Sequence, residues 1–235
     1  MSISDIFPID NWNFKRESVL KDLPEKDQQQ LDAAKIMHTY NKGEVVFRQG
    51  GYPSGIFYIV KGKVKKYTTD RHNREQIVYV ANEGELLGYH AILAEDRYPD
   101  SAAALEESVI EFVPKENFLA VIDNSEVLTR RLLKTLSHEF AVLANNLSMQ
   151  AQRSVRERLA LHLIILREKY KVDFSPGMPV EISFSRDDLA SLVGTVRENV
   201  IRLLTEFKEE GILETKGRKI VILDVKKLIN IADYH

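Results

Sequence analysis

Residues 185–210, SRDDLASLVGTVRENVIRLLTEFKEE, decide the fold that we expect for this chain. Ser185 and Asp188 have the Ser-x-x-acid spacing of a helix start, where the hydroxyl accepts from first-turn amides and the acid reaches back. A short helix to Val193, a break at Gly194 and a second helix over about 195–210 follow. This spacing predicts a helix-turn-helix.

The second helix has two contrasting faces at 100° per residue. We expect one face in the core: Val196, Val200, Leu203, Leu204 and Phe207. The outward set is Arg197, Glu198, Ile201, Arg202 and Thr205, and Thr195 at the start of the helix is a further candidate DNA contact. Arginine can donate two bonds to guanine, glutamate can accept from cytosine, and isoleucine can meet a thymine methyl, so this face predicts base reading. The alternative is a plain surface helix on which Glu198 and Arg202 form an i,i+4 ion pair.

A hairpin is predicted directly after this helix, over 211–223, with the basic turn Lys-Gly-Arg-Lys. We expect it to be a wing on which Lys216, Arg218 and Lys219 touch DNA phosphates. Such contacts add affinity without sequence information and weaken as salt rises.

Short β-branched and aromatic runs fill the stretch from about 36 to 114, for example at 44–47, 56–60, 63–67 and 76–80. Gly, Asn, Asp or Pro bounds each run, which is typical of strands joined by tight turns. Many short strands at near-regular spacing predict a small antiparallel barrel or jelly roll.

From about 123 to 152 Gly and Pro vanish, and apolar residues recur at steps of three and four. Such a stripe is a heptad seam, which predicts a helix that pairs with a second copy. The seam residues are Leu133, Leu136, Phe140, Leu143 and Leu147. The alternative is one amphipathic helix packed on its own β-domain.

A chain of 235 residues suits two domains, and 44% hydrophobic with 29% charged residues is ordinary for a globular protein. We predict an α+β chain: a β-roll domain with a helical lead-in over 1–122, a dimerisation helix over 123–152, and a winged helix-turn-helix over 153–235. The first residues lack a secretory signal pattern, so we expect a cytoplasmic protein. The absence of cysteine excludes disulfides, thiolate zinc sites and cysteine-held iron–sulfur clusters.

Three blocks resemble the Crp/Fnr family of bacterial transcription regulators, over nearly the whole chain. They are residues 40–64 with YNKGE, RQG and FYIVKGKV, residues 83–88 with EGELLG, and residues 192–202 with LVGTVRENVIR. The resemblance implies a cyclic-nucleotide-binding-like sensor, a homodimer, and RNA polymerase as a further partner. It also implies that Arg197, Glu198 and Arg202 read TGTGA-like half-sites of a palindrome in double-stranded DNA.

The sensor departs from the cyclic-AMP-binding members, which have a Gly-Glu pair for the ribose and an Arg-Ser or Arg-Thr pair for the phosphate. Here Tyr89 follows Gly88, and Asp100 precedes Ser101. A carboxylate there would repel a phosphate, and the dimer-helix position Leu143 offers no hydroxyl to a purine. The resemblance therefore implies an effector other than cyclic AMP, or none.

We expect any effector pocket to face the dimer helix and to suit a neutral or cationic small molecule. Its predicted lining is Gly88, Tyr89, His90, Tyr98, Asp100, Ser101 and Leu143. Alternatively, these side chains fill the space themselves and the sensor binds nothing. Haem on His72 or His90 is a further option, although lone histidines are more often structural.

Two other classes of function compete with a DNA-binding regulator. A cupin-like enzyme needs clustered histidine and carboxylate ligands, but the histidines are spread singly, so we expect no metal site, no cofactor and no enzyme. A protein-binding winged domain would not need the outward set on the second helix.

Overall fold

The computed structural model describes the chain apart from residues 1–2, 4–5, 14–18, 172–179 and 234–235. Contacts divide it into two compact units, residues 15–138 and residues 1–14 with 139–235. We call them the sensor unit and the DNA-binding unit and describe each by itself. The division falls inside the long helix, whereas the sequence placed domain boundaries at the two ends of that helix.

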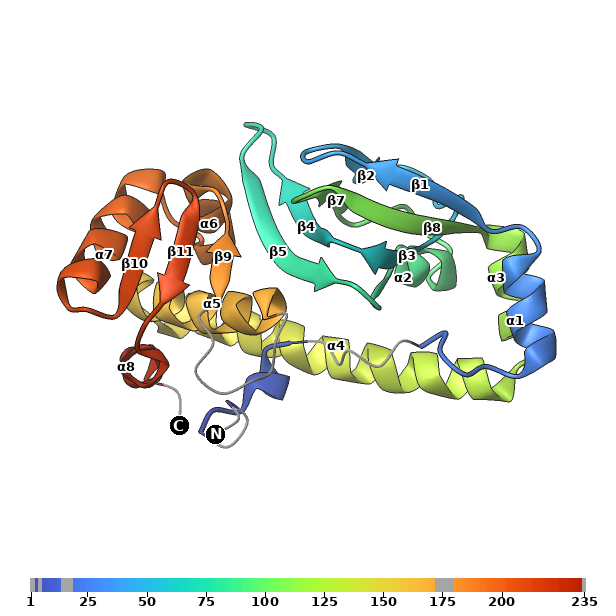
Figure 1. The fold of residues 1–235 in the computed structure, drawn as a ribbon. Helices are drawn as coiled ribbons and strands as arrows, with labels where there is room; N and C mark the ends of the chain where they lie inside the picture. Colours follow the sequence, from blue (N-terminus) through green and yellow to red (C-terminus); the bar gives the residue numbers. More distant parts are fainter. Residues whose placement is uncertain (1–2, 4–5, 14–18, 172–179, 234–235) are drawn as a thin grey trace. The chain divides into compact units, whose positions relative to one another are not determined.

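The sensor unit is built on two four-stranded antiparallel sheets, as the sequence predicted (Figure 1). One sheet has the order β1-β8-β3-β6 and the other β2-β7-β4-β5. The strands are β1 Ile36–Tyr40, β2 Val45–Phe47, β3 Gly55–Lys61, β4 Lys63–Thr69, β5 Glu75–Asn82, β6 Leu86–Leu87, β7 Ser101–Ala104 and β8 Ser108–Pro114.

Gly62 makes the tight reversal between β3 and β4 possible. Its φ is +97°, and a Cβ at this position would lie 2.3 Å from Ser108 Oγ and 2.8 Å from Ser108 Cα. Only glycine avoids both the left-handed strain and this clash. The reversal places β4 against β5 and β7 in the second sheet.

Helices close one side of the sensor core. They are α1 Glu25–Asp32, α2 Tyr89–Leu93, α3 Lys115–Ile122 and the first half of α4, which spans Glu126–Gln152. Leu31, Ile56, Phe118, Val121 and Leu128 are buried together in one apolar cluster. The helical lead-in and the long helix are thus confirmed.

The α4 helix carries the predicted apolar seam, and four of its five members are exposed. Leu133, Phe140, Leu143 and Leu147 have 62%, 75%, 45% and 74% of their surface exposed. Leu136 differs, because it packs partly against the sensor core. Val142, on the same helix, is fully buried. The exposed stripe therefore consists of Leu133, Phe140, Leu143 and Leu147.

The described part of the DNA-binding unit contains a three-stranded antiparallel sheet, in the order β10-β11-β9, four α-helices beyond α4 and one short 3-10 helix, η2 (Figure 1). The elements are η2 Ile9–Asn11, α5 Val155–Tyr170, β9 Glu181–Ser183, α6 Arg186–Val193, α7 Arg197–Glu209, β10 Leu213–Lys216, β11 Lys219–Ile222 and α8 Val225–Ala232. A capping box of Ser154 and Glu157 starts α5 just after α4 ends. In the described part of the chain, no helix is long and apolar enough to cross a membrane.

Candidate DNA interface and sensor site

The turn between α6 and α7 is set by its sequence signals. Ser185 Oγ accepts from the Asp188 amide at 3.0 Å and caps α6. Gly194 ends α6 with φ +72°, a left-handed conformation that glycine adopts without strain. Asn199 Nδ2 donates to Thr195 Oγ1 at 3.0 Å across the start of α7. Thr195 thus holds the turn, and it is only partly accessible to a base.

One residue of the predicted core face is wrong. Val200, Leu203, Leu204 and Phe207 are buried, but Val196 is 58% exposed. The α7 helix begins at Arg197, and Val196 is its cap with extended φ −87° and ψ 153°. A helical wheel does not apply to a residue outside the helix, so Val196 does not share the apolar face.

The outward face of α7 has the predicted composition. Arg197, Glu198, Ile201, Arg202 and Thr205 are all exposed. Ile201 has 44% of its surface exposed although it is apolar. Burying it in a partner would therefore gain free energy that a merely solvated helix forgoes.

The two arginines of this face are held by acids, but not in the predicted pair. Arg197 Nη1 lies 3.6 Å from Asp187 Oδ1 of α6, and Arg202 Nη1 pairs with Glu206, one turn further along α7. The alternative pair of Glu198 with Arg202 is therefore replaced by Arg202 with Glu206. Both arginine side chains are more than half exposed, so these pairs are weak and can be exchanged for a base or phosphate.

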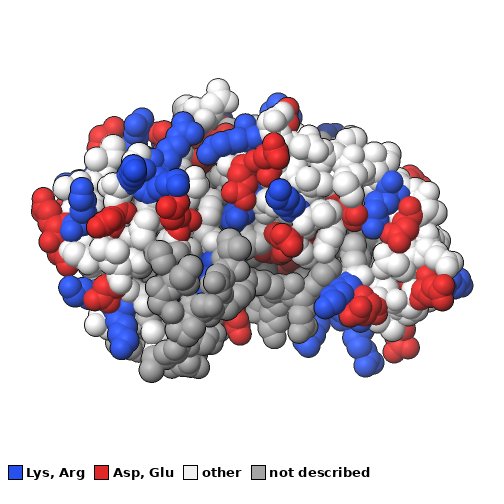
Figure 2. Space-filling model, in the orientation of Figure 1, with Lys and Arg blue, Asp and Glu red and all other residues white. Residues whose placement is uncertain are grey.

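The wing forms where the sequence placed it. Gly217, with φ +60°, turns the chain between β10 and β11, and Lys216 and Arg218 flank it on the surface. Figure 2 shows Lys and Arg side chains near the tip of this hairpin, with acidic side chains between them. Lys219 Nζ is paired with Glu181 Oε2 of β9 at 2.6 Å. Lys219 must therefore exchange a carboxylate for a phosphate to contribute to binding.

Two arginines of α5 that sequence reasoning missed support the recognition helix. Arg158 Nε donates to Val193 O at 2.9 Å and Nη2 to Gly194 O at 3.1 Å, at the turn before α7. Arg156 contacts the other end, because it pairs with Glu206 at 2.9 Å and stacks over the ring of Phe207. Sequence spacing cannot show these contacts, since each joins α5 to a residue far along the chain.

In the sensor unit, the predicted pocket residues are largely engaged with one another. Gly88, with φ +80°, is the N-cap of α2. Tyr89, the first residue of this helix, lies in the core and is only 1% exposed. The ring of Tyr98 stacks on Phe47 with 4.2 Å between centroids. Burial raises the pKa of Tyr98 to about 12, so its phenol stays protonated. Both rings therefore pack in the core of the sensor unit.

Asp100 is the most informative residue of the sensor site. Its carboxylate is 6% exposed and lies 3.2 Å from Lys66 Nζ. Its other oxygen, Oδ1, has no hydrogen-bond partner among the described residues and lies 4.0 Å from His90 Nε2. Burial, aided by the charge of Lys66, lowers the pKa of His90 to about 4, so its ring is neutral at pH 7. Ser101 Oγ accepts from the Gln49 amide at 2.9 Å.

The remaining predicted sensor residues are Leu143 and His72. Leu143 is half exposed and belongs to the DNA-binding unit, so its place in a pocket stays a prediction. His72 lies in the exposed β4–β5 turn. Among the residues that the structure describes, no group of three His, Cys, Asp or Glu could hold a metal ion.

Two family profiles match the chain, one in each half. The profile "Cyclic nucleotide-binding domain" matches residues 37–125, and the profile "Crp-like helix-turn-helix domain" matches residues 157–231. Together they cover the sheets of the sensor unit and the helix-turn-helix with its wing. The first 36 residues lie outside both matches.

Proteins of similar sequence or fold support the same assignment. The "Transcriptional activator protein anr" of Pseudomonas aeruginosa is 27% identical over 191 residues, which cover 81% of this chain and 78% of that protein. The "Fumarate and nitrate reduction regulatory protein" of Vibrio cholerae is 29% identical over 81% of this chain and 76% of its own. The structure of FixK2 from Bradyrhizobium japonicum shares the fold, with TM-score 0.74 at 20% identity over 86% of this chain and 99% of that one. The first two relatives are named as an activator and a regulatory protein, so the cupin-like enzyme receives no support.

Proposed function

We propose that this chain is a transcription regulator of the Crp/Fnr family with a DNA-binding winged helix-turn-helix, and that it reads a palindromic site as a homodimer. The observation that carries the proposal is the outward face of α7. Two guanidinium groups, a carboxylate and an exposed isoleucine lie there, opposite four buried apolar residues. That combination suits base edges in a major groove.

Within this site, we assign roles by chemistry. Arg197 and Arg202 donate to guanine, Glu198 accepts from cytosine, and Ile201 meets a thymine methyl. Half-sites that resemble TGTGA fit this set. Thr195 and Thr205 are secondary, because their hydroxyls already bond to Asn199 and to the Ile201 carbonyl.

The wing supplies affinity rather than specificity. Lys216 and Arg218 are exposed at its turn, and no acid among the described residues forms an ion pair with them, so they are the first candidates for phosphate contacts. Lys219 contributes only once its pair with Glu181 opens. Removing one phosphate-binding side chain should lower the slope of log affinity against log salt by about 0.9.

We further propose that the exposed α4 stripe pairs with that of a second copy. Four large apolar side chains in heptad steps are costly to leave in water, and the pairing would bury them along one seam. A two-fold dimer then places two recognition helices about 34–36 Å apart, one turn of DNA. RNA polymerase is a further expected partner, since a relative carries the name of an activator, and such a protein would act in the cytoplasm.

For the sensor, we propose that cyclic AMP is not the effector. An anionic phosphate near Asp100 would be repelled by this carboxylate or would have to take Lys66 from it. Removing one partner from a buried pair costs about 3–5 kcal/mol. A neutral or cationic molecule avoids this cost and can bond to Asp100 Oδ1; the other possibility, which the filled core around Tyr89 and Tyr98 favours, is that no effector binds.

The test is selection of bound sequences from random duplex DNA by the purified, ligand-free protein at a fixed salt concentration. We expect enrichment of a palindrome with half-site centres about one helical turn apart. Adding cyclic AMP should change neither the selected site nor the melting temperature. Selection of unrelated sequences, with and without added nucleotide, would contradict the proposal.

A further inference from the structure

The N-terminal segment, residue 3 with residues 6–13, packs with the DNA-binding unit although the chain that follows it belongs to the sensor unit. Its apolar side chains are buried. Ile3, Phe7, Ile9 and Trp12 expose only 5%, 2%, 7% and 3% of their surface. Four buried anchors in so short a segment are far more than a loose chain end needs, and neither family profile includes them.

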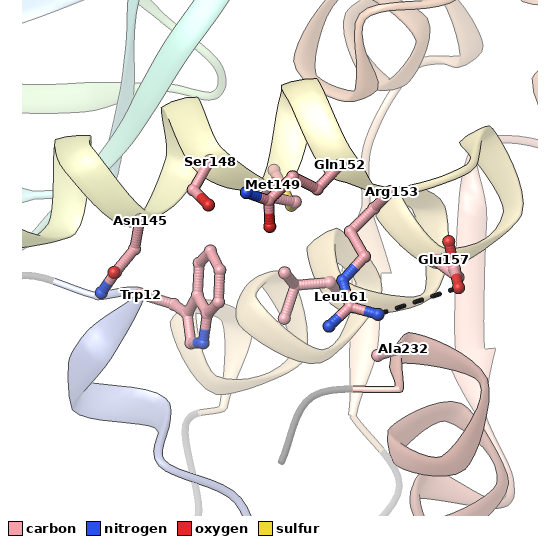
Figure 3. A pocket seen from close by; sticks show the side chains of 9 residues that line it. All are labelled: Trp12, Asn145, Ser148, Met149, Gln152, Arg153, Glu157, Leu161 and Ala232. Atoms are coloured by element: carbon pink, nitrogen blue, oxygen red, sulfur yellow. Dashed lines mark ion pairs between the residues drawn. The ribbon is translucent and has the colours of Figure 1, made fainter.

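The segment docks at the junction of α4 and α5. Asn145 Nδ2 of α4 donates to the Asn11 carbonyl at 2.9 Å. The indole of Trp12 lies under the last turns of α4, beside Met149 and Leu161, and together with polar side chains these residues enclose a cavity of about 70 Å³ (Figure 3). The cavity can hold water, but it is too small for a ligand of ordinary size.

The far wall of this cavity is the junction between α4 and α5, which we call the hinge. Arg153, between α4 and α5, pairs with Glu157 at 3.9 Å (Figure 3). It also pairs with Asp233, after α8, at 3.0 Å. Met149, Leu161 and Ala232 are each at most 3% exposed, so elements from both sides of the hinge close on the indole. Trp12 therefore packs against residues from both sides of the junction of α4 and α5.

The hinge is connected to the recognition helix by hydrogen bonds. Arg158 Nη1 donates to the Arg153 carbonyl at 2.9 Å, while its other nitrogens donate to the carbonyls of Val193 and Gly194. On the α4 side, Gln150 Oε1 would lie 2.9 Å from a Cβ at Gly194. A shift at the hinge therefore reaches the turn that precedes α7.

We propose that Trp12 is a positioning residue for DNA binding, which holds the α4–α5 hinge, and through it the recognition helix, in the DNA-binding arrangement. The inference rests on the proposed function. Trp12 touches no DNA; it acts by filling the hinge. Substitutions in such connecting networks change coupling by an amount that corresponds to about 2- to 30-fold in affinity.

The chain's single tryptophan gives a direct readout of the segment. In the free protein we expect acrylamide to quench the emission of Trp12 weakly, because the indole is buried. Coupling is reciprocal, so binding of the selected DNA site should change that quenching in the wild-type protein. A merely structural tryptophan would stabilise the fold without responding to DNA.

The variants are Trp12→Ala and the conservative Trp12→Phe, with Tyr52→Ala as the matched control. Tyr52 is an exposed aromatic residue of the sensor unit, 73% accessible. At a temperature at which the variant is still folded, we expect Trp12→Ala to bind the selected site about 2- to 30-fold more weakly than the wild type. Added indole should restore most of this affinity by filling the cavity, and Trp12→Phe should retain most of it. Tyr52→Ala should bind as the wild type does.

The outcomes separate the two proposals. If the wild type selects no site, the proposed function fails. If the wild type binds its site and Trp12→Ala binds it equally, or if Trp12 quenching ignores DNA, the positioning role is overturned while the proposed function stands. Strong quenching of the free protein would also overturn it, because the segment would then not be docked.

Discussion

Replacing Arg197 by alanine tests base reading separately from phosphate binding. The side chain is 56% exposed and its ion-pair partner Asp187 is 70% exposed, with 3.6 Å between them. A pair so exposed is worth about 0–1 kcal/mol, and it must be broken before the guanidinium reaches a base. A bidentate contact to guanine contributes about 1–3 kcal/mol. Over most of that range, the free energy gained from the guanine contact exceeds the free energy lost when the pair of Arg197 with Asp187 is broken.

For Arg197→Ala we expect binding to the selected site to weaken by about 5- to 150-fold. Binding to random DNA should fall much less, so the specificity ratio falls by nearly the whole amount. Asp187→Asn should act in the opposite direction, with a gain of at most about fivefold, because it frees the guanidinium. The assay is fluorescence anisotropy with matched specific and random duplexes over a salt series.

Arg218→Ala is the matched control, since it removes one exposed arginine from the wing instead. Its affinity should fall about equally on both duplexes, and the salt slope should drop by about 0.9. Equal weakening of Arg197→Ala on specific and random DNA would refute the base-reading role and would place Arg197 among the phosphate contacts.

Four further substitutions test the rest of the structure. Phe140→Glu puts a charge into the 75%-exposed centre of the α4 stripe and should yield monomers in sedimentation velocity; surviving dimers would move the interface elsewhere. Gly62→Ala, which combines a φ of +97° with a clash against Ser108, should lower the free energy of urea unfolding by more than about 2 kcal/mol. Gly43→Ala, with φ +87° in open space, should cost only about 1 kcal/mol, and equal costs would refute the clash. His162 is buried, and burial lowers its pKa to about 3. The unfolded state therefore binds a proton at this residue at a higher pH than the folded state does, and stability should fall as the pH drops from 6.5 towards 3. His162→Leu should reduce that slope by up to about 1.4 kcal/mol per pH unit.

The winged helix-turn-helix was predictable because its signals are local. Ser185 caps α6, Gly194 ends it, and the rhythm of apolar residues from Val200 to Phe207 marks the buried face of α7. Local signals also explain the one error. Val196 was included by extending the rhythm past the helix start, where the extended backbone turns its side chain to the surface.

The sensor was harder to read, since its chemistry depends on pairing between strands. The acid at Asp100 was visible in the sequence, but its partner Lys66 was not. Lys66 pairs with Ala102 in the register of β4 with β7, which carries Asp100 to the lysine across the sheet. Without that register, a lone acid suggests a binding site for a cation. With it, one carboxylate oxygen of Asp100 pairs with Lys66, and Oδ1 is left without a hydrogen-bond partner among the described residues.

The N-terminal segment shows the same limit at longer range. Nothing in residues 6–13 signals a role, because one tryptophan and a few aliphatic or aromatic side chains match any short amphipathic stretch. Its meaning depends on Met149 and Leu161, far along the chain, and on a hinge whose other contacts lead to Gly194. If the hinge were held by the α4–α5 backbone alone, these anchors would add stability and nothing more. The hydrogen bonds from Arg158 to both the hinge and the turn before α7 are what make the packing of Trp12 relevant to DNA recognition.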